Sequence, residues 1–156
     1  MEERNISFFD FRVFEKPAVI SRVPLSCSQD IFNLYSHFSK SDREMFVCVF
    51  LNAKNHLIRD EIITLGTVDS SAVYPREVFR SALFYGAVSI ICVHNHPSGD
   101  PEPSESDNQI TRALVHGAHL LGLRILDHVV VGDGRYFSYA DQGKIEDFEA
   151  DIIRSL

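Results

Sequence analysis

Residues 87–93 form a short, continuous apolar run that leads directly into His94. A strand without a polar face must be covered on both sides, as in the centre of a sheet between two layers. The run is preceded by residues 75–86, which have Pro75 at the expected first helical position, an apolar stripe and a terminal Gly86. It is followed, after a proline-containing loop at 95–103, by a helical pattern over 104–122. The central half of the chain therefore predicts helix, buried strand, loop and helix.

The flanking segments predict further strands and helices. Residues 45–51 and 56–65 resemble a β-hairpin, and residues 123–131 and 135–139 form a second one around Gly132-Asp133-Gly134. A strand over 7–15, a short helix capped by Ser28 or Asp30 with apolar positions from Ile31 to Phe38, and a final helix within 141–156 complete the pattern. We predict a single α/β domain with a mixed β-sheet flanked by helices, and 156 residues leave no room for a second full domain.

Composition limits the function. The chain has 15 Lys and Arg against 22 Asp and Glu, a net charge of −7, and its basic residues are scattered. This composition argues against nucleic acid as a partner, since a sequence-tolerant binder needs a basic surface to displace counterions. The three cysteines, Cys27, Cys48 and Cys92, are widely spaced, which predicts no disulfide framework and fits a reducing cytoplasm. No signal peptide or membrane span is expected.

The segment from His94 to Asp107 carries the strongest chemical signal. His94 and His96 alternate in an extended chain and so project to the same side, and a stiff loop returns the chain to a helix with Asp107 in its first turn. Two imidazoles and one carboxylate suit Zn²⁺, which keeps a fourth position for water when it is catalytic. Ser104 and Asp107 also form a capping box, and a histidine at a strand end can simply be hydrogen-bonded. The combination of these features favours one bound zinc ion per chain.

The spacing His-x-His, seven residues, Ser, two residues, Asp resembles the motif of the JAB/MPN (JAMM) metalloproteases, in the form carried by their RadC-like branch. The resemblance extends from about Glu44 to Tyr139 and includes Leu126-Asp127-His128. It implies a cytidine-deaminase-like sandwich, an N-terminal extension at 1–40, the metal-binding domain at 41–141 and a tail at 142–156. It also implies that His94, His96 and Asp107 bind zinc and that Ser104 helps to hold an oxyanion. Members commonly carry a helix-hairpin-helix segment before this domain, so the chain looks like a short, stand-alone form.

The family also uses a glutamate as general base, and Glu44 matches it by its position before the apolar run 45–51. Glu77 is the rival, but a glutamate in a first helical turn is explained by the helix dipole. His128 and Cys92 are candidates to support the metal ligands from behind, although a buried thiol usually serves packing. His116 and His119, three residues apart, could pair on a metal but do not match the motif.

The resemblance implies a zinc-dependent hydrolase that cleaves a peptide or isopeptide bond, with a peptide or protein conjugate as substrate. One alternative is a catalytically silent protein-binding module of the same fold. Another is a metal-dependent nuclease linked to DNA repair, although nucleases usually hold Mg²⁺ with carboxylates. The aromatic segment 8–14 could pair with a second copy of the chain as an exposed strand.

Overall fold

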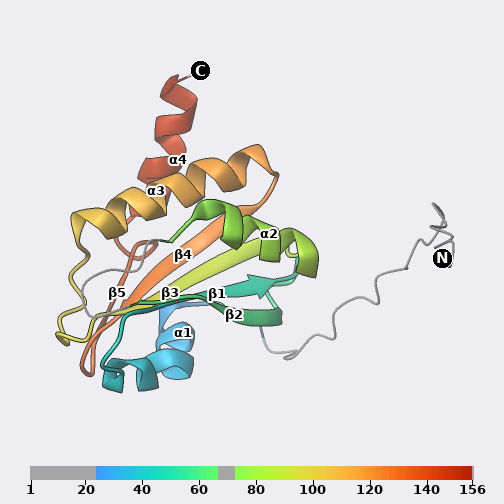
Figure 1. Cartoon of the computed structure of the whole chain (residues 1–156). Helices are drawn as coiled ribbons and strands as arrows, with labels where there is room; N and C mark the ends of the chain where they lie inside the picture. Colours follow the sequence, from blue (N-terminus) through green and yellow to red (C-terminus); the bar gives the residue numbers. More distant parts are fainter. Residues whose placement is uncertain (1–23, 67–72, 156) are drawn as a thin grey trace, which may run out of the picture.

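The computed structural model describes residues 24–66 and 73–155, which form a five-stranded sheet with helices on both faces (Figure 1). The elements, in chain order, are α1 (Ser28–Tyr35), a 3₁₀ turn (Ser36–Lys40), β1 (Met45–Leu51), β2 (Leu57–Leu65), α2 (Pro75–Tyr85), β3 (Ser89–Asn95), α3 (Glu105–Leu120), β4 (Arg124–Val131), β5 (Tyr136–Ser138) and α4 (Lys144–Ser155). The predicted α/β architecture is confirmed. The strand expected at 7–15, with the aromatic segment 8–14, lies outside the described residues.

The sheet is mixed, with the strand order β2-β1-β3-β4-β5. β3 and β4 run parallel, and the other neighbouring pairs are antiparallel. Phe46 near the start of β1 is paired with His94 near the end of β3. The beginning of β1 therefore lies at the same end of the sheet as the carboxyl end of β3, where open α/β sheets commonly bind ligands.

Helices α2, α3 and α4 lie on one face of the sheet and α1 lies on the other (Figure 1). The two faces carry separate apolar clusters, with Cys48, Ile90 and Leu114 in the first and Ile31, Val49 and Val93 in the second. Every residue of β3 is buried, because both faces of this strand are covered. This double coverage explains the continuous apolar run in the sequence.

The ends of α2 follow the local signals closely. Pro75 is in the first turn, and Gly86 ends the helix in a left-handed conformation with φ of +64°. This conformation favours glycine because it has no Cβ.

Helix α1 differs from the prediction at both ends. Its N-cap is Cys27 rather than Ser28 or Asp30, and the Asp30 carboxylate instead accepts the backbone N–H groups of Ser26 and Cys27 at 3.0 and 3.3 Å. A carboxylate at the third helical position can reach back in this way and satisfy donors that precede the helix. The α-helix ends at Tyr35, so Phe38 belongs to the 3₁₀ turn.

The loop before α3 begins one residue later than predicted. Asn95 is the last residue of β3, because β4 continues beside it and pairs Asn95 with Val131. None of the described helices is long and apolar enough to cross a membrane. All three cysteines are free, as their spacing predicts, with Cys48 and Cys92 buried and Cys27 exposed.

Candidate metal centre

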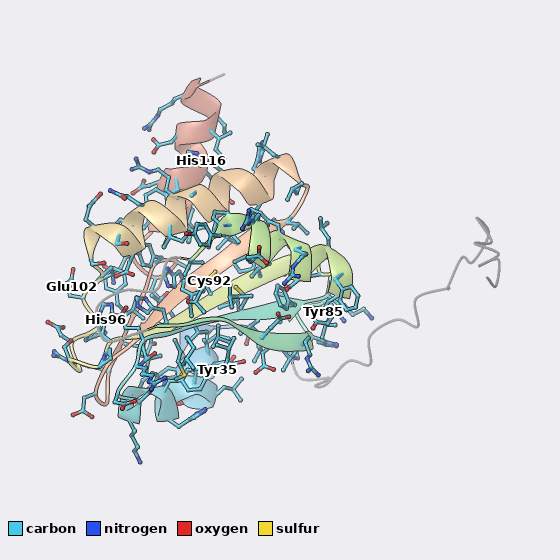
Figure 2. All side chains as sticks on the ribbon, viewed as in Figure 1. Tyr35, Tyr85, Cys92, His96, Glu102 and His116 are labelled. Atoms are coloured by element: carbon cyan, nitrogen blue, oxygen red, sulfur yellow. The ribbon has the colours of Figure 1, made fainter. Side chains whose placement is uncertain are left out.

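Three side chains of the predicted motif meet at the carboxyl end of β3. Nδ1 of His94 lies 3.3 Å from Oδ1 of Asp107, and Nε2 of His96 lies 3.3 Å from Oδ2 of the same carboxylate. His94 and Asp107 are each only 7% exposed. Figure 2 shows His96 at the same end of the molecule as Glu102, which belongs to the loop that joins β3 to α3. Strand, loop and helix thus bring the two imidazoles and the carboxylate together as the spacing predicts.

The β3–α3 loop is held by the turn between β4 and β5. The N–H of Asp133 donates to the carbonyl of Gly99 at 2.9 Å. Gly132 passes so close that a Cβ there would lie 2.5 Å from the Gly99 carbonyl oxygen and 2.7 Å from the ring of Pro101. Only a glycine at position 132 permits this approach, which fixes the path of the chain from His96 to Asp107.

Asp107 takes part in a complete capping box at the start of α3. Its Oδ2 accepts the backbone N–H of Ser104 at 2.7 Å and the hydroxyl at 2.6 Å, while its own N–H donates to Ser104 Oγ at 3.2 Å. Burial acts to raise the pKa of this carboxyl. The neighbouring His96 and His94 and the bonds from Ser104 outweigh burial and hold the pKa well below its usual range. Asp107 is therefore an anion that faces two imidazoles.

Each of the two imidazoles faces that anion with a ring nitrogen. His96 Nδ1 lies 2.7 Å from the carbonyl oxygen of Asp100, which can only accept, so Nδ1 carries the proton. In a neutral imidazole Nε2 then has none, yet it faces Asp107. Burial lowers the pKa of His94 to about 4, which keeps that ring neutral at pH 7. The buried Nδ1 of His94 also has no hydrogen-bond partner among the described residues, because its contact with Asp107 is close but poorly directed.

This donor set fits a bound cation. Two ring nitrogens and a carboxylate converge, and a metal-binding histidine typically donates its other N–H to a carbonyl, as His96 does to Asp100. When no cation is bound, a proton on Nε2 of His96 can lie between this nitrogen and the Asp107 carboxylate. The hydrogen bond to Asp107 accordingly raises the pKa of His96, against the effect of burial.

Glu44 completes the group. It lies one residue before β1, and its ligand atom, with one from His94 and one from His96, forms a set in which all atoms are within 4.8 Å of one another. Glu44, His94 and His96 could therefore hold a metal ion, with Asp107 in contact with both histidines. The rival, Glu77, lies in the first turn of α2, where its carboxylate contacts Arg76 at 3.1 Å and Arg80 at 3.2 Å.

A hydrogen-bonded pair of buried side chains, Thr111 and His128, lies behind the metal centre, and only His128 is a candidate from the sequence. The hydroxyl of Thr111 donates to the backbone carbonyl of Asp107, so Thr111 Oγ1 must accept from Nδ1 of His128, 2.7 Å away. Thr111 and His128 are 1% and 0% exposed. Burial lowers the pKa of His128 to about 3, and its Nε2 has no partner among the described residues. Thr111 was missed, although its position four residues after Asp107 on one helix was a usable signal.

The other candidate side chains lie apart from this group. Cys92 is buried opposite Cys48 on the neighbouring strand, between the sheet and the helices (Figure 2). His116 lies near α4, where its Nε2 is 3.1 Å from the carbonyl oxygen of Phe148. His119 is exposed on α3. Among the described residues, the cluster that could hold a metal contains neither His116 nor His119.

Comparison with known proteins agrees with the geometry. A family model described as RadC-like JAB domain matches residues 25–144. A UPF0758 protein of Methanosarcina mazei is 44% identical over 123 residues, which cover 78% of this chain and 54% of that protein. A UPF0758 protein of Bacillus cereus is 47% identical over 103 residues, which cover 66% of this chain and 46% of that protein. The chain thus spans about half the length of the curated relatives it matches.

Proposed function

The chain belongs to the RadC-like JAB domain family, and on this premise we propose that it is a zinc-dependent hydrolase that cleaves a peptide or isopeptide bond. His94, His96 and Asp107 are the residues that would hold the ion, and Glu44 is the general base. The substrate is a peptide or a protein conjugate.

One observation carries the proposal: the ring nitrogens His94 Nδ1 and His96 Nε2 both lie 3.3 Å from the Asp107 carboxylate, while the Asp100 carbonyl keeps the proton of His96 on Nδ1. In neutral His96 the facing Nε2 therefore carries only a lone pair, and it repels the anion unless a proton or a cation lies between them. Two nitrogen ligands and one oxygen ligand favour zinc over magnesium, which prefers oxygen ligands and keeps much of its water.

The chain's own residues supply the proton transfers. When bound, a zinc ion lowers the pKa of a water to near 7 and polarises the scissile carbonyl. The Glu44 carboxylate takes a proton from the attacking water as the new C–O bond forms, and it delivers that proton to the leaving nitrogen as the C–N bond breaks. Both transfers require the carboxylate within one hydrogen bond of the reacting atoms, and its place beside His94 and His96 supports this role.

Ser104 is the candidate donor to the developing oxyanion. It is exposed at the start of α3, but its hydroxyl donates to Asp107 Oδ2. The backbone N–H of Ser104 also donates to Oδ2 and keeps the carboxylate in place. The hydroxyl is therefore free to turn toward a substrate without releasing Asp107 altogether, and it then stabilises charge that develops in the transition state.

The first test is metal content, by mass spectrometry, of protein purified without a histidine tag. We expect about one zinc per chain in the wild type, and loss of zinc in His96→Ala and Asp107→Ala while circular dichroism shows a retained fold. Glu44→Gln is then compared with the wild type on a panel of peptides and isopeptide-linked conjugates.

Each outcome has a distinct meaning. Hydrolysis by the wild type that falls at least a hundredfold in Glu44→Gln supports the hydrolase. Stoichiometric zinc without turnover on any conjugate indicates a protein-binding module of the same fold. Absence of zinc from the wild type, even after zinc is supplied, overturns the metal centre.

A further inference from the structure

Asn95, the residue between the two histidines, holds the backbone on both sides of Glu44. It is 0% exposed. Its Oδ1 accepts the backbone N–H of Met45 at 2.8 Å, and its Nδ2 donates to the carbonyl of Arg43 at 3.0 Å. One side chain amide thus bonds the residue before Glu44 and the residue after it.

These bonds extend the sheet beyond its last backbone pair. Phe46 and His94 are the last partners in the register between β1 and β3, so Glu44 is outside the ladder. On the other side of Glu44, its carbonyl accepts the N–H of Gly66 at 2.8 Å, just past the end of β2. Residues 43–45 are therefore tied to both neighbouring strands.

The Glu44 carboxylate itself depends on this backbone. Within residues 24–66 and 73–155, no hydrogen bond or ion pair to another side chain fixes it. Its position relative to His94 and His96 therefore follows from the path of residues 43–45. A misplacement of about 1 Å can cost on the order of a hundredfold in rate, so this path matters to a general base.

We propose that Asn95 is a positioning residue that sets the Glu44 carboxylate opposite the His94–His96 pair. The inference rests on the proposed function, because it assigns a purpose to Glu44 at the metal centre. An amide is needed here because the backbone N–H of Met45 is a donor and the carbonyl of Arg43 is an acceptor. Leucine has the same size but bonds neither, whereas aspartate can accept from Met45 and cannot donate to Arg43.

The test is a double-mutant cycle in zinc affinity, which needs no substrate. Zinc is titrated against a chromophoric chelator in the wild type, Glu44→Gln, Asn95→Leu and the double variant. Because Glu44 contributes a negative charge beside the ion, we expect Glu44→Gln to lower the affinity about tenfold. Asn95→Leu should lower it by a similar factor in the wild type, and by less than twofold in the Glu44→Gln background.

Asn52 supplies a matched control. It lies at the opposite end of β1, where its Oδ1 accepts the N–H groups of Lys54 and His56 at 2.8 and 3.1 Å. Asn52→Leu should lower resistance to urea without changing zinc affinity. If Asn95→Leu does not fold, Asn95→Asp keeps the acceptor and is measured in the same cycle.

An equal loss of affinity from Asn95→Leu in both backgrounds, or no loss in either, overturns the inference while the wild type still binds zinc. A wild type that binds no zinc overturns the proposed function, and the inference with it. Zinc binding without hydrolysis removes only the proposed activity, and the cycle still decides whether Asn95 acts through Glu44.

Discussion

Acidification should destabilise the metal-free protein through His128. This imidazole is fully buried, and burial lowers its pKa from 6.5 to about 3. Below pH 6.5 the unfolded chain takes up a proton on His128 that the folded chain does not. The unfolded state therefore binds more protons, and the free energy of unfolding decreases as the pH falls.

The size of this effect follows from the pKa difference. Each pH unit between the two pKa values changes the stability by about 1.4 kcal/mol. From pH 6.5 to pH 5.0, His128 thus contributes a loss of roughly 2 kcal/mol. His94, whose pKa burial lowers to about 4, acts in the same direction, whereas the raised pKa of His96 acts in the opposite direction. A comparison with a variant is therefore needed to isolate His128.

The assay is urea unfolding followed by circular dichroism at pH 6.5 and pH 5.0, with a chelator present. His128→Asn should be less stable than the wild type at both pH values, because it loses a buried ring. Between the two pH values, however, it should lose about 2 kcal/mol less than the wild type. His119→Gln, an exposed change on α3, should lose as much as the wild type. An equal pH-dependent loss in His128→Asn and the wild type would refute the reasoning.

Three further predictions concern the metal centre and the residues that hold its ligands in place. Thr111→Val removes the hydroxyl that links Asp107 to His128, so zinc affinity measured by chelator competition should fall roughly tenfold, and Thr111→Ser should restore it. Gly132→Ala forces a Cβ against the Gly99 carbonyl and should lower the free energy of unfolding by about 1–3 kcal/mol; an unchanged urea midpoint would contradict that close approach. Zinc at about 100 times its dissociation constant should add about 2.7 kcal/mol to the wild type and nothing to His96→Ala, as thermal and urea unfolding can establish.

Local signals predicted most of the fold. Pro75 and Gly86 mark the ends of α2 because the first turn and the left-handed terminus are decided by the residues themselves. The predicted N-cap of α1 was wrong for two reasons. A thiol is not a usual N-cap, and Asp30 could serve either at the cap or three positions into the helix. Only the structure shows which backbone N–H groups the carboxylate reaches.

The site shows the same division between local and distant information. His94, His96 and Asp107 are joined by one strand, loop and helix, so their spacing was enough to predict that they meet. Glu44 is fifty residues before His94, and its place depends on the register of β1 against β3, which periodicity does not reveal. The family resemblance supplied Glu44, whereas Asn95 had no signal beyond its place in the motif.

The helix cap and the metal ligand are two uses of one side chain rather than rival explanations of Asp107. Oδ2 receives the N–H and hydroxyl of Ser104, and these bonds fix the plane of the carboxylate. Oδ1 then lies beside His94, and each oxygen is 3.3 Å from an imidazole nitrogen. The backbone carbonyl of the same residue is bound by Thr111, which ties the first turn of α3 to β4. A capping box at this position therefore supports the metal centre, because it holds an ionised carboxylate in place before any ion binds.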